Sequence, residues 1–168
     1  TAPAVYTADL AASLNNLSVQ RSGTGDPAGA LAAIEEAVTL RRELAATAPA
    51  VYTADLAASL NNLSVQRSGT GDPAGALAAI EEAVTLYREL AATAPAVYTA
   101  DLAMSLNNLS NRRSGTGDPA GALAAIEEAV TLYRELAATA PAVYTADLAM
   151  SLNNLSNRRS GTGDPAGA

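Results

Sequence analysis

Paired asparagines recur along the chain at a fixed spacing. The segment SLNNLS spans residues 13–18 and returns at residues 59, 105 and 151. Asparagine is unfavourable in the middle of a helix because its amide competes for backbone hydrogen bonds. The same amide supplies donors and acceptors that match the N–H and C=O groups of an extended peptide. We therefore expect the pairs to bind a peptide or to hydrogen-bond neighbouring copies of the segment, and both roles can coexist.

Two other patterns could suggest catalysis, and neither has the residues that catalysis needs. The segment SGTGDPAG lacks the Lys-Ser/Thr of a phosphate-binding loop and follows a predicted helix, so it indicates a turn. Glu35 and Glu36 point about 100° apart on a helix, which favours a solvated face over a metal or acid–base site. The chain contains no His, Cys or Lys, so the usual nucleophile–base pairs cannot form. The sequence predicts no enzyme activity, no cofactor and no metal.

The charge and the hydropathy of the sequence argue against two classes of binding partner. The formal charge is −7, which argues against a nucleic-acid surface and against an anionic membrane. No apolar run reaches the roughly 18 to 20 residues of a membrane span, and no signal peptide opens the sequence. We expect a cytoplasmic protein that binds neither nucleic acid nor membrane. Because the sequence does not begin with Met, we interpret it as part of something longer.

The whole chain is a tandem array. Equivalent threonines at positions 1, 47, 93 and 139 give a period of 46 residues. The predicted units are residues 1–46, 47–92 and 93–138, followed by a partial copy at 139–168. Such repeats are stacked units that cannot bury their apolar faces alone. The copies are nearly identical: Arg41 becomes Tyr87 in the second, and Ala58, Val65 and Gln66 become Met104, Asn111 and Arg112 in the third.

Each repeat is predicted to form two antiparallel helices. The pair Asp26-Pro27 is typical of an N-cap and first-turn proline, which places the second helix at about Pro27 to Ala46. The first helix is expected from near Pro3 to near Ser22, with Thr7 as the cap of a shorter alternative. At 3.6 residues per turn the first helix buries a stripe at Leu10, Leu14 and Leu17. The second helix has apolar residues on two flanks, which favours a solenoid over an isolated hairpin.

The stretch SLNNLSVQRSGTGDPAGALAAIEEAVTLYRELA, residues 59–91, resembles tetratricopeptide repeats. It is most similar to the longer kinesin-light-chain-like variety, found also in bacterial proteins with near-identical repeats. The shared features are the LNNL segment at residues 60–63, Gly71, Ala76 and the AVTLYR segment at residues 83–88. The resemblance implies an all-α, right-handed solenoid. HEAT and armadillo repeats have similar periods but lack the LNNL segment, so they are the second choice.

The sequence departs from that family in two respects. The period is about four residues longer, and an extra turn at the start of the first helix would absorb the excess. Arg21, Arg67, Arg113 and Arg159 stand where the family usually has a large apolar residue. We expect their stems to pack and their guanidinium groups to reach solvent or a carbonyl.

The resemblance also implies a concave groove that is lined by the first helices and binds extended peptides. On a helical wheel the paired asparagines point away from the second helix. Two of the three helix positions that vary between copies fall on the same side, although drift on an exposed surface would give the same pattern. The predicted groove residues are Asn15, Asn16, Asn61, Asn62, Met104, Asn107, Asn108, Asn111, Met150, Asn153, Asn154 and Asn157.

The function predicted from these features is a scaffold that binds a protein or an extended peptide. Two alternatives remain: a sensor array in a larger bacterial signalling ATPase, and a structural spacer that assembles with itself. Neither end of the sequence shows a polar capping repeat. Uncovered leucines, including Leu148, Leu152 and Leu155, therefore predict end-to-end self-association.

Overall fold

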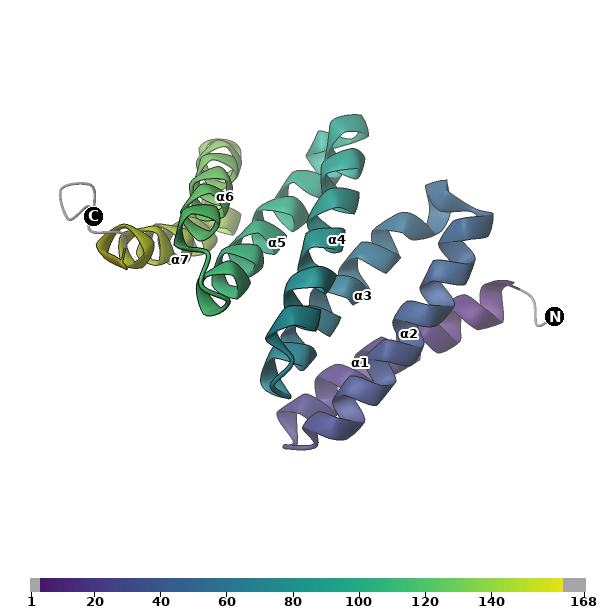
Figure 1. The fold of residues 1–168 in the computed structure, drawn as a ribbon. Helices are drawn as coiled ribbons and strands as arrows, with labels where there is room; N and C mark the ends of the chain where they lie inside the picture. Colours follow the sequence, from purple (N-terminus) through teal and green to yellow (C-terminus); the bar gives the residue numbers. More distant parts are fainter. Residues whose placement is uncertain (1–3, 162–168) are drawn as a thin grey trace. The chain divides into compact units, whose positions relative to one another are not determined.

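The computed structural model describes residues 4–161, and these fold entirely into α-helices (Figure 1). The helices in chain order are α1 (Ala4–Gly23), α2 (Pro27–Thr47), α3 (Pro49–Gly69), α4 (Pro73–Thr93), α5 (Pro95–Gly115), α6 (Pro119–Thr139) and α7 (Pro141–Gly161). The all-α prediction is confirmed. The predicted opening of a fourth second helix at Asp164-Pro165, and the residues before Ala4, lie outside the described residues.

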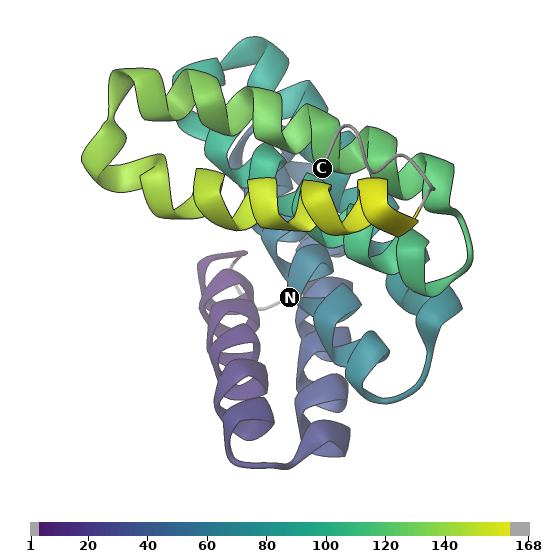
Figure 2. The same ribbon diagram turned by 90° about the vertical axis from the view of Figure 1, so that its left-hand side faces the viewer.

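The helices form two compact units whose boundary falls inside α4. In the first unit, residues 1–86, α1 packs on α2 and α2 packs on α3. In the second unit, residues 87–168, α5 packs on α6 and α6 packs on α7. Figure 2 shows α1 beside α2, and α6 beside α7, each pair running antiparallel and joined by a short turn. Within each unit, therefore, three consecutive helices pack against one another in sequence order, as in a solenoid.

The turn inside each repeat has the chemistry that the sequence predicts. Asp26 caps α2, because its Oδ1 accepts a hydrogen bond of 2.9 Å from the Gly29 N–H, and Pro27 occupies the first turn. Gly25 adopts a φ of 81°, a left-handed conformation that suits glycine. A Cβ at residue 29 would lie 2.1 Å from Asp26 Oδ2, so any other residue there would displace the carboxylate that caps the helix. The same contacts recur at Asp118 and Gly121 in the second unit.

The turn between repeats is a single residue. Helix α2 ends at Thr47 and α3 begins at Pro49, so only Ala48 separates them. The additional residues of the long repeat therefore extend the first helix at its start, as expected. The shorter alternative that began at Thr7 is wrong, because Thr7 lies inside α1.

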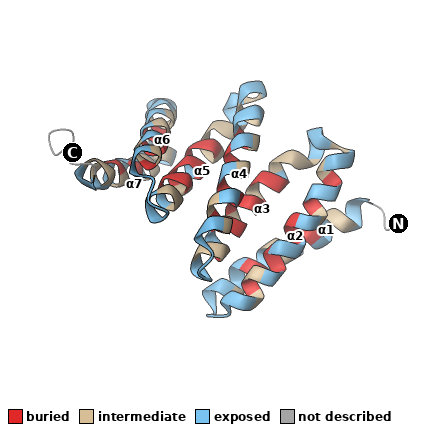
Figure 3. Cartoon of the chain, viewed as in Figure 1, coloured by how far each residue is buried: buried red, intermediate tan, exposed pale blue. Residues whose placement is uncertain are grey.

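The core lies where consecutive helices meet, and the turns are exposed (Figure 3). In α3 the predicted leucine stripe is buried at Leu56, Leu60 and Leu63. In α1 the equivalent Leu10 and Leu17 are 48% and 37% exposed, because no earlier helix covers that side of the described chain.

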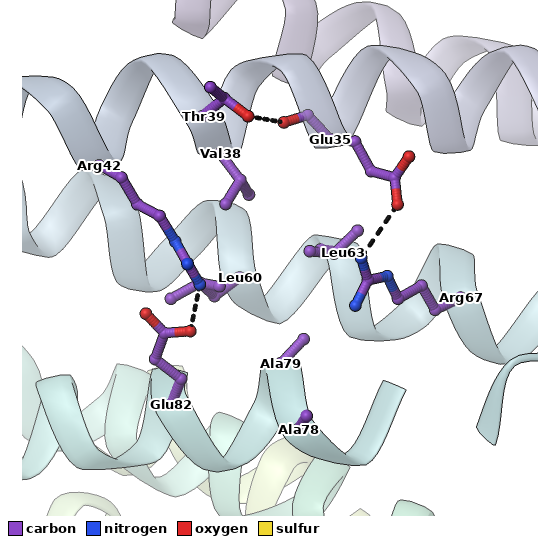
Figure 4. A pocket seen from close by; sticks show the side chains of 10 residues that line it. All are labelled: Glu35, Val38, Thr39, Arg42, Leu60, Leu63, Arg67, Ala78, Ala79 and Glu82. Carbon is purple, nitrogen blue, oxygen red and sulfur yellow. Dashed lines mark hydrogen bonds and ion pairs between the residues drawn. The ribbon is translucent and has the colours of Figure 1, made fainter. Parts of the chain in front are cut away.

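One prediction about α7 is wrong. Leu155 was expected to lose its covering partner, but it is buried, whereas Leu152 is exposed and Leu148 is half-buried. The equivalent residue of α3, Leu63, lies beside Val38 of the preceding helix (Figure 4). A leucine at this position is therefore covered by the preceding second helix, and in α7 that helix is α6.

Candidate functional site

In two of the pairs, the first asparagine connects one repeat to the next. In the first unit Asn15 Oδ1 accepts hydrogen bonds from Ser59 Oγ at 3.2 Å and from Asn62 Nδ2 at 3.0 Å. In the second unit Asn107 Nδ2 donates to Ser151 Oγ at 2.6 Å, and Asn107 Oδ1 accepts from Asn154 Nδ2 at 3.3 Å. The two units thus repeat one arrangement, which supports the expected role of the asparagines in joining neighbouring copies.

The predicted groove residues differ in their access to solvent. Asn61 and Asn107 are 6% and 5% exposed, contrary to the expectation that they face an open groove. Their burial follows from their place between successive first helices. Four others are half-buried: Asn15, Asn62, Asn108 and Asn154. Six are exposed: Asn16, Met104, Asn111, Met150, Asn153 and Asn157.

Four of the predicted residues meet at a hollow of about 240 Å³ in the second unit. Met104, Asn107 and Asn108 of α5 line it, together with Met150 of α7. Sequence reasoning missed its other lining residues, which are Ala100, Asp101, Tyr133 and Asp147. One feature of the sequence could have indicated this site. Tyr133 of α6 is equivalent to Arg41, so the two residues mark a position that differs between copies.

The hollow is electronegative. Burial, with smaller contributions from the nearby Asp147, Asp101 and Tyr144, raises the pKa of Tyr133 to about 12, so its hydroxyl stays protonated at neutral pH. Burial also raises the pKa of Asp101 above its usual range. No arginine lines the hollow, and the carboxylates of Asp101 and Asp147 have no ion pair within residues 4–161.

The equivalent position in the first unit carries a cation. Arg41 is buried, and its Nη1 donates to the Asp55 backbone carbonyl at 2.7 Å and to Ser59 Oγ. In the second unit the corresponding carbonyl, that of Asp147, accepts instead from Ser151 Oγ at 2.9 Å. The two units therefore differ in whether the chain itself places a guanidinium group against the following first helix.

The other variable positions also have an inter-repeat role. Asn111 Oδ1 accepts from Arg158 Nη2 at 2.7 Å, and Arg158 donates further hydrogen bonds to Ser114 Oγ at 3.0 Å and Ser110 Oγ at 3.3 Å. Arg158 is the next copy's equivalent of Arg112. The exchanges at these positions thus provide a polar link between α5 and α7.

A second hollow, of about 410 Å³, lies in the first unit between α2, α3 and the first part of α4 (Figure 4). Its rim carries two ion pairs, Glu35 with Arg67 at 3.0 Å and Glu82 with Arg42. Leu60 and Leu63 line its floor but are almost completely buried. Its charges are paired and its leucines are covered, so it has the features of a seam between repeats and offers a ligand little apolar surface.

Arginines that recur near the ends of the first helices contact the turns that follow them. Arg21 Nη1 donates to the Gly29 carbonyl at 3.3 Å, and Arg113 Nη1 makes the equivalent contact with Gly121 at 3.5 Å. Arg67 is only partly exposed and reaches Glu35 of the preceding repeat. The predicted contact of the guanidinium group with a carbonyl is confirmed for Arg21 and Arg113.

Two further features of residues 4–161 bear on the classes of function. None of their helices is both long enough and apolar enough to span a membrane. Nowhere in this range do three or more Asp or Glu side chains gather in a way that could hold a metal ion.

Comparison with known proteins identifies the family. The profile described as "Tetratricopeptide repeat" matches residues 10–45, 56–91 and 102–137, together more than half of the chain. No curated protein matches the sequence. Among solved structures, BtubC (BKLC) from P. vanneervenii is 20% identical with a TM-score of 0.78, covering 94% of this chain and 58% of that one.

A second solved structure has the same fold. It is the Podosopora anserina putative kinesin light chain with nearly identical TPR-like repeats, 16% identical with a TM-score of 0.70, covering 94% of this chain and 69% of that one. At these identities the two likenesses establish the fold alone. Because the profile matches three successive copies in register, the chain belongs to the tetratricopeptide repeat family.

Proposed function

We propose that this chain binds an extended peptide segment of a partner protein along the face formed by its first helices. Tetratricopeptide repeats are generally protein-interaction scaffolds and are typically not enzymes. The finer assignment rests on one observation, the hollow that α5, α6 and α7 form in the second unit. Met104 and Met150 flank this hollow from consecutive first helices and remain 42% and 53% exposed.

The chemistry of the hollow suits a peptide. Methionine side chains are flexible and polarisable, so exposed methionines adapt to apolar side chains of different shapes. Asn108 also lines the hollow and adds a polar side chain beside them. Asn107 has a different role, because Ser151 and Asn154 already occupy its donor and its acceptor. The proposed contact residues are therefore the two methionines, Met104 and Met150.

Replacing both methionines by alanine tests this proposal with little risk to the fold. Alanine is the natural residue at the equivalent positions Ala12 and Ala58 of the earlier copies. Peptides are first selected from a random displayed library for binding to the wild-type chain. They should bind the Met104→Ala, Met150→Ala variant at least about tenfold more weakly, because each substitution removes apolar contact with the peptide.

The matched control is Val143→Ala. Val143 is an exposed apolar residue of α7 that does not line the hollow, so its loss should leave peptide affinity unchanged. If the selected peptides bind the double methionine variant as tightly as the wild type, the peptide-binding assignment of this hollow is wrong.

A further inference from the structure

We propose that the hollow between α5, α6 and α7 receives an arginine side chain of the bound peptide. The inference rests on the proposed peptide-binding function and adds the chemical class of the ligand. Three observations on the second unit carry it: the residue exchange at position 133, the unpaired charges around it, and the flanking methionines.

The first unit shows what a guanidinium group does at this position. Arg41 is buried there, and it donates to a backbone carbonyl and to a serine hydroxyl of the following first helix. Tyr133 replaces it in the second unit, and its phenol can neither supply a positive charge nor donate more than one hydrogen bond. In the second unit Ser151 Oγ takes over the hydrogen bond to the Asp147 carbonyl, but nothing in the lining of the hollow replaces the positive charge of Arg41.

The charges around the hollow select the sign of the ligand. Asp101 and Asp147 approach Tyr133 from α5 and α7, and no basic side chain lines the hollow. Carboxylates without an ion pair in a partly desolvated site attract a cation and repel an anion. A guanidinium group fits better than an ammonium because its planar array of donors can reach a carboxylate and a neighbouring carbonyl together.

The flanks of the hollow suit the rest of an arginine residue. An arginine side chain packs its aliphatic stem on apolar surface while its charged end stays hydrogen-bonded. Met104 and Met150 provide that surface on either side of the carboxylates. A bare metal ion fits less well, because residues 4–161 contain no group of three or more potential metal ligands.

The chain offers a direct reporter for the test. It contains only two methionines, Met104 and Met150, and both line the hollow. Labelling the methionine methyl groups with 13C therefore gives an NMR spectrum with two signals, both from the proposed site. The probes are three tripeptides, acetyl-Leu-X-Leu-amide, in which X is arginine, its neutral isostere citrulline, or glutamate.

The arginine peptide should shift both methyl signals in a saturable titration. Its dissociation constant should be at least tenfold lower than that of the citrulline peptide, and the glutamate peptide should bind more weakly still. Tyr133→Arg should abolish the response to the arginine peptide, because the variant brings its own guanidinium group to the hollow, at the position that Arg41 has in the first unit. Asp101→Asn combined with Asp147→Asn should reduce the preference for arginine over citrulline to less than threefold.

The control is Glu135→Gln, which removes one negative charge from an exposed position of α6 outside the hollow and should leave the preference intact. Equal affinity for the arginine and citrulline peptides would overturn the arginine assignment while leaving the peptide-binding proposal standing. A tighter complex with the glutamate peptide would overturn it as well. If none of the three peptides moves either methyl signal, both this inference and the peptide-binding proposal for the hollow fail.

Discussion

The asparagine link between repeats gives the sharpest test of how the fold is held together. Asn107 is buried and makes two side-chain hydrogen bonds to α7, with Ser151 and with Asn154. Replacing Asn107 with Ala removes both. A net contribution of about 0.5 to 1.5 kcal/mol for each hydrogen bond gives a loss of about 1 to 3 kcal/mol in the free energy of unfolding.

A matched control isolates this contribution. Asn153 is the equivalent residue of α7, it is exposed, and it makes no side-chain hydrogen bond among the described residues. Asn153→Ala should stabilise the helix by a few tenths of a kcal/mol, because alanine has the higher helix propensity. Asn107→Ala gains the same stabilisation from helix propensity. The difference in the free energy of unfolding between the two variants therefore measures the inter-repeat hydrogen bonds.

Urea denaturation followed by circular dichroism at 222 nm measures both variants. We expect Asn107→Ala to be less stable than Asn153→Ala by about 2 kcal/mol, which corresponds to a melting temperature lower by about 4 to 8 °C for a chain of this size. Equal midpoints with equal denaturant slopes for the two variants would refute the reasoning. The asparagine pairs would then need another explanation for their recurrence.

Three further predictions concern charge, ionisation and assembly. Arg67→Leu should change the free energy of unfolding by less than about 1 kcal/mol, because the ion pair of Arg67 with Glu35 lies at the surface and a leucine can pack where the arginine stem lies. A loss above about 2 kcal/mol, measured by urea denaturation, would contradict this. The pKa of Tyr133 is about 12 in the folded chain, against 10.0 for the free residue, so folding favours the protonated phenol. Its contribution to stability is therefore complete below pH 10 and should fall by at most about 2.7 kcal/mol as the pH rises to 12. Denaturation curves across this range should show that slope in the wild type and lose it in Tyr133→Phe. A polypeptide of these 168 residues should self-associate through the leucines exposed near its ends, such as Leu10 and Leu152, and a light-scattering mass that stays at 16.8 kDa at high concentration would disprove this.

Local signals in the sequence predicted the helices well. Asp26-Pro27 and the glycines before it determine where one helix stops and the next starts, and these effects act within a few residues. The leucine stripe also followed from periodicity, because a helix with one apolar face must turn that face inward. Copies of one unit then extend the prediction over the whole chain, since each repeat packs on its neighbours.

The placement of individual polar residues could not be predicted in the same way. A helical wheel fixes the direction of Asn107 relative to its own helix, but its burial depends on α7, which packs against it 44 residues later. The wheel likewise places Asn111 on the side of the predicted groove but cannot show that its partner, Arg158, comes from the next repeat. Such contacts depend on the stagger between repeats, and the pattern within one copy contains no information about that stagger.

Differences between near-identical copies carry the information that periodicity lacks. Residues shared by all copies, such as the ion-paired Glu35 and Arg67 and their equivalents Glu127 and Arg159, pair within each unit, and they explain stacking rather than recognition. The exchange of Arg41 for Tyr133 is different, because Ser151 Oγ takes over the hydrogen bond to the carbonyl while nothing in the lining of the hollow replaces the positive charge. A position that carries a cation in one copy, and carboxylates without an ion pair in another, is where we propose that a ligand supplies the charge. This asymmetry, more than the repeated asparagines, points to the hollow beside Tyr133 as the place where the array acquires specificity.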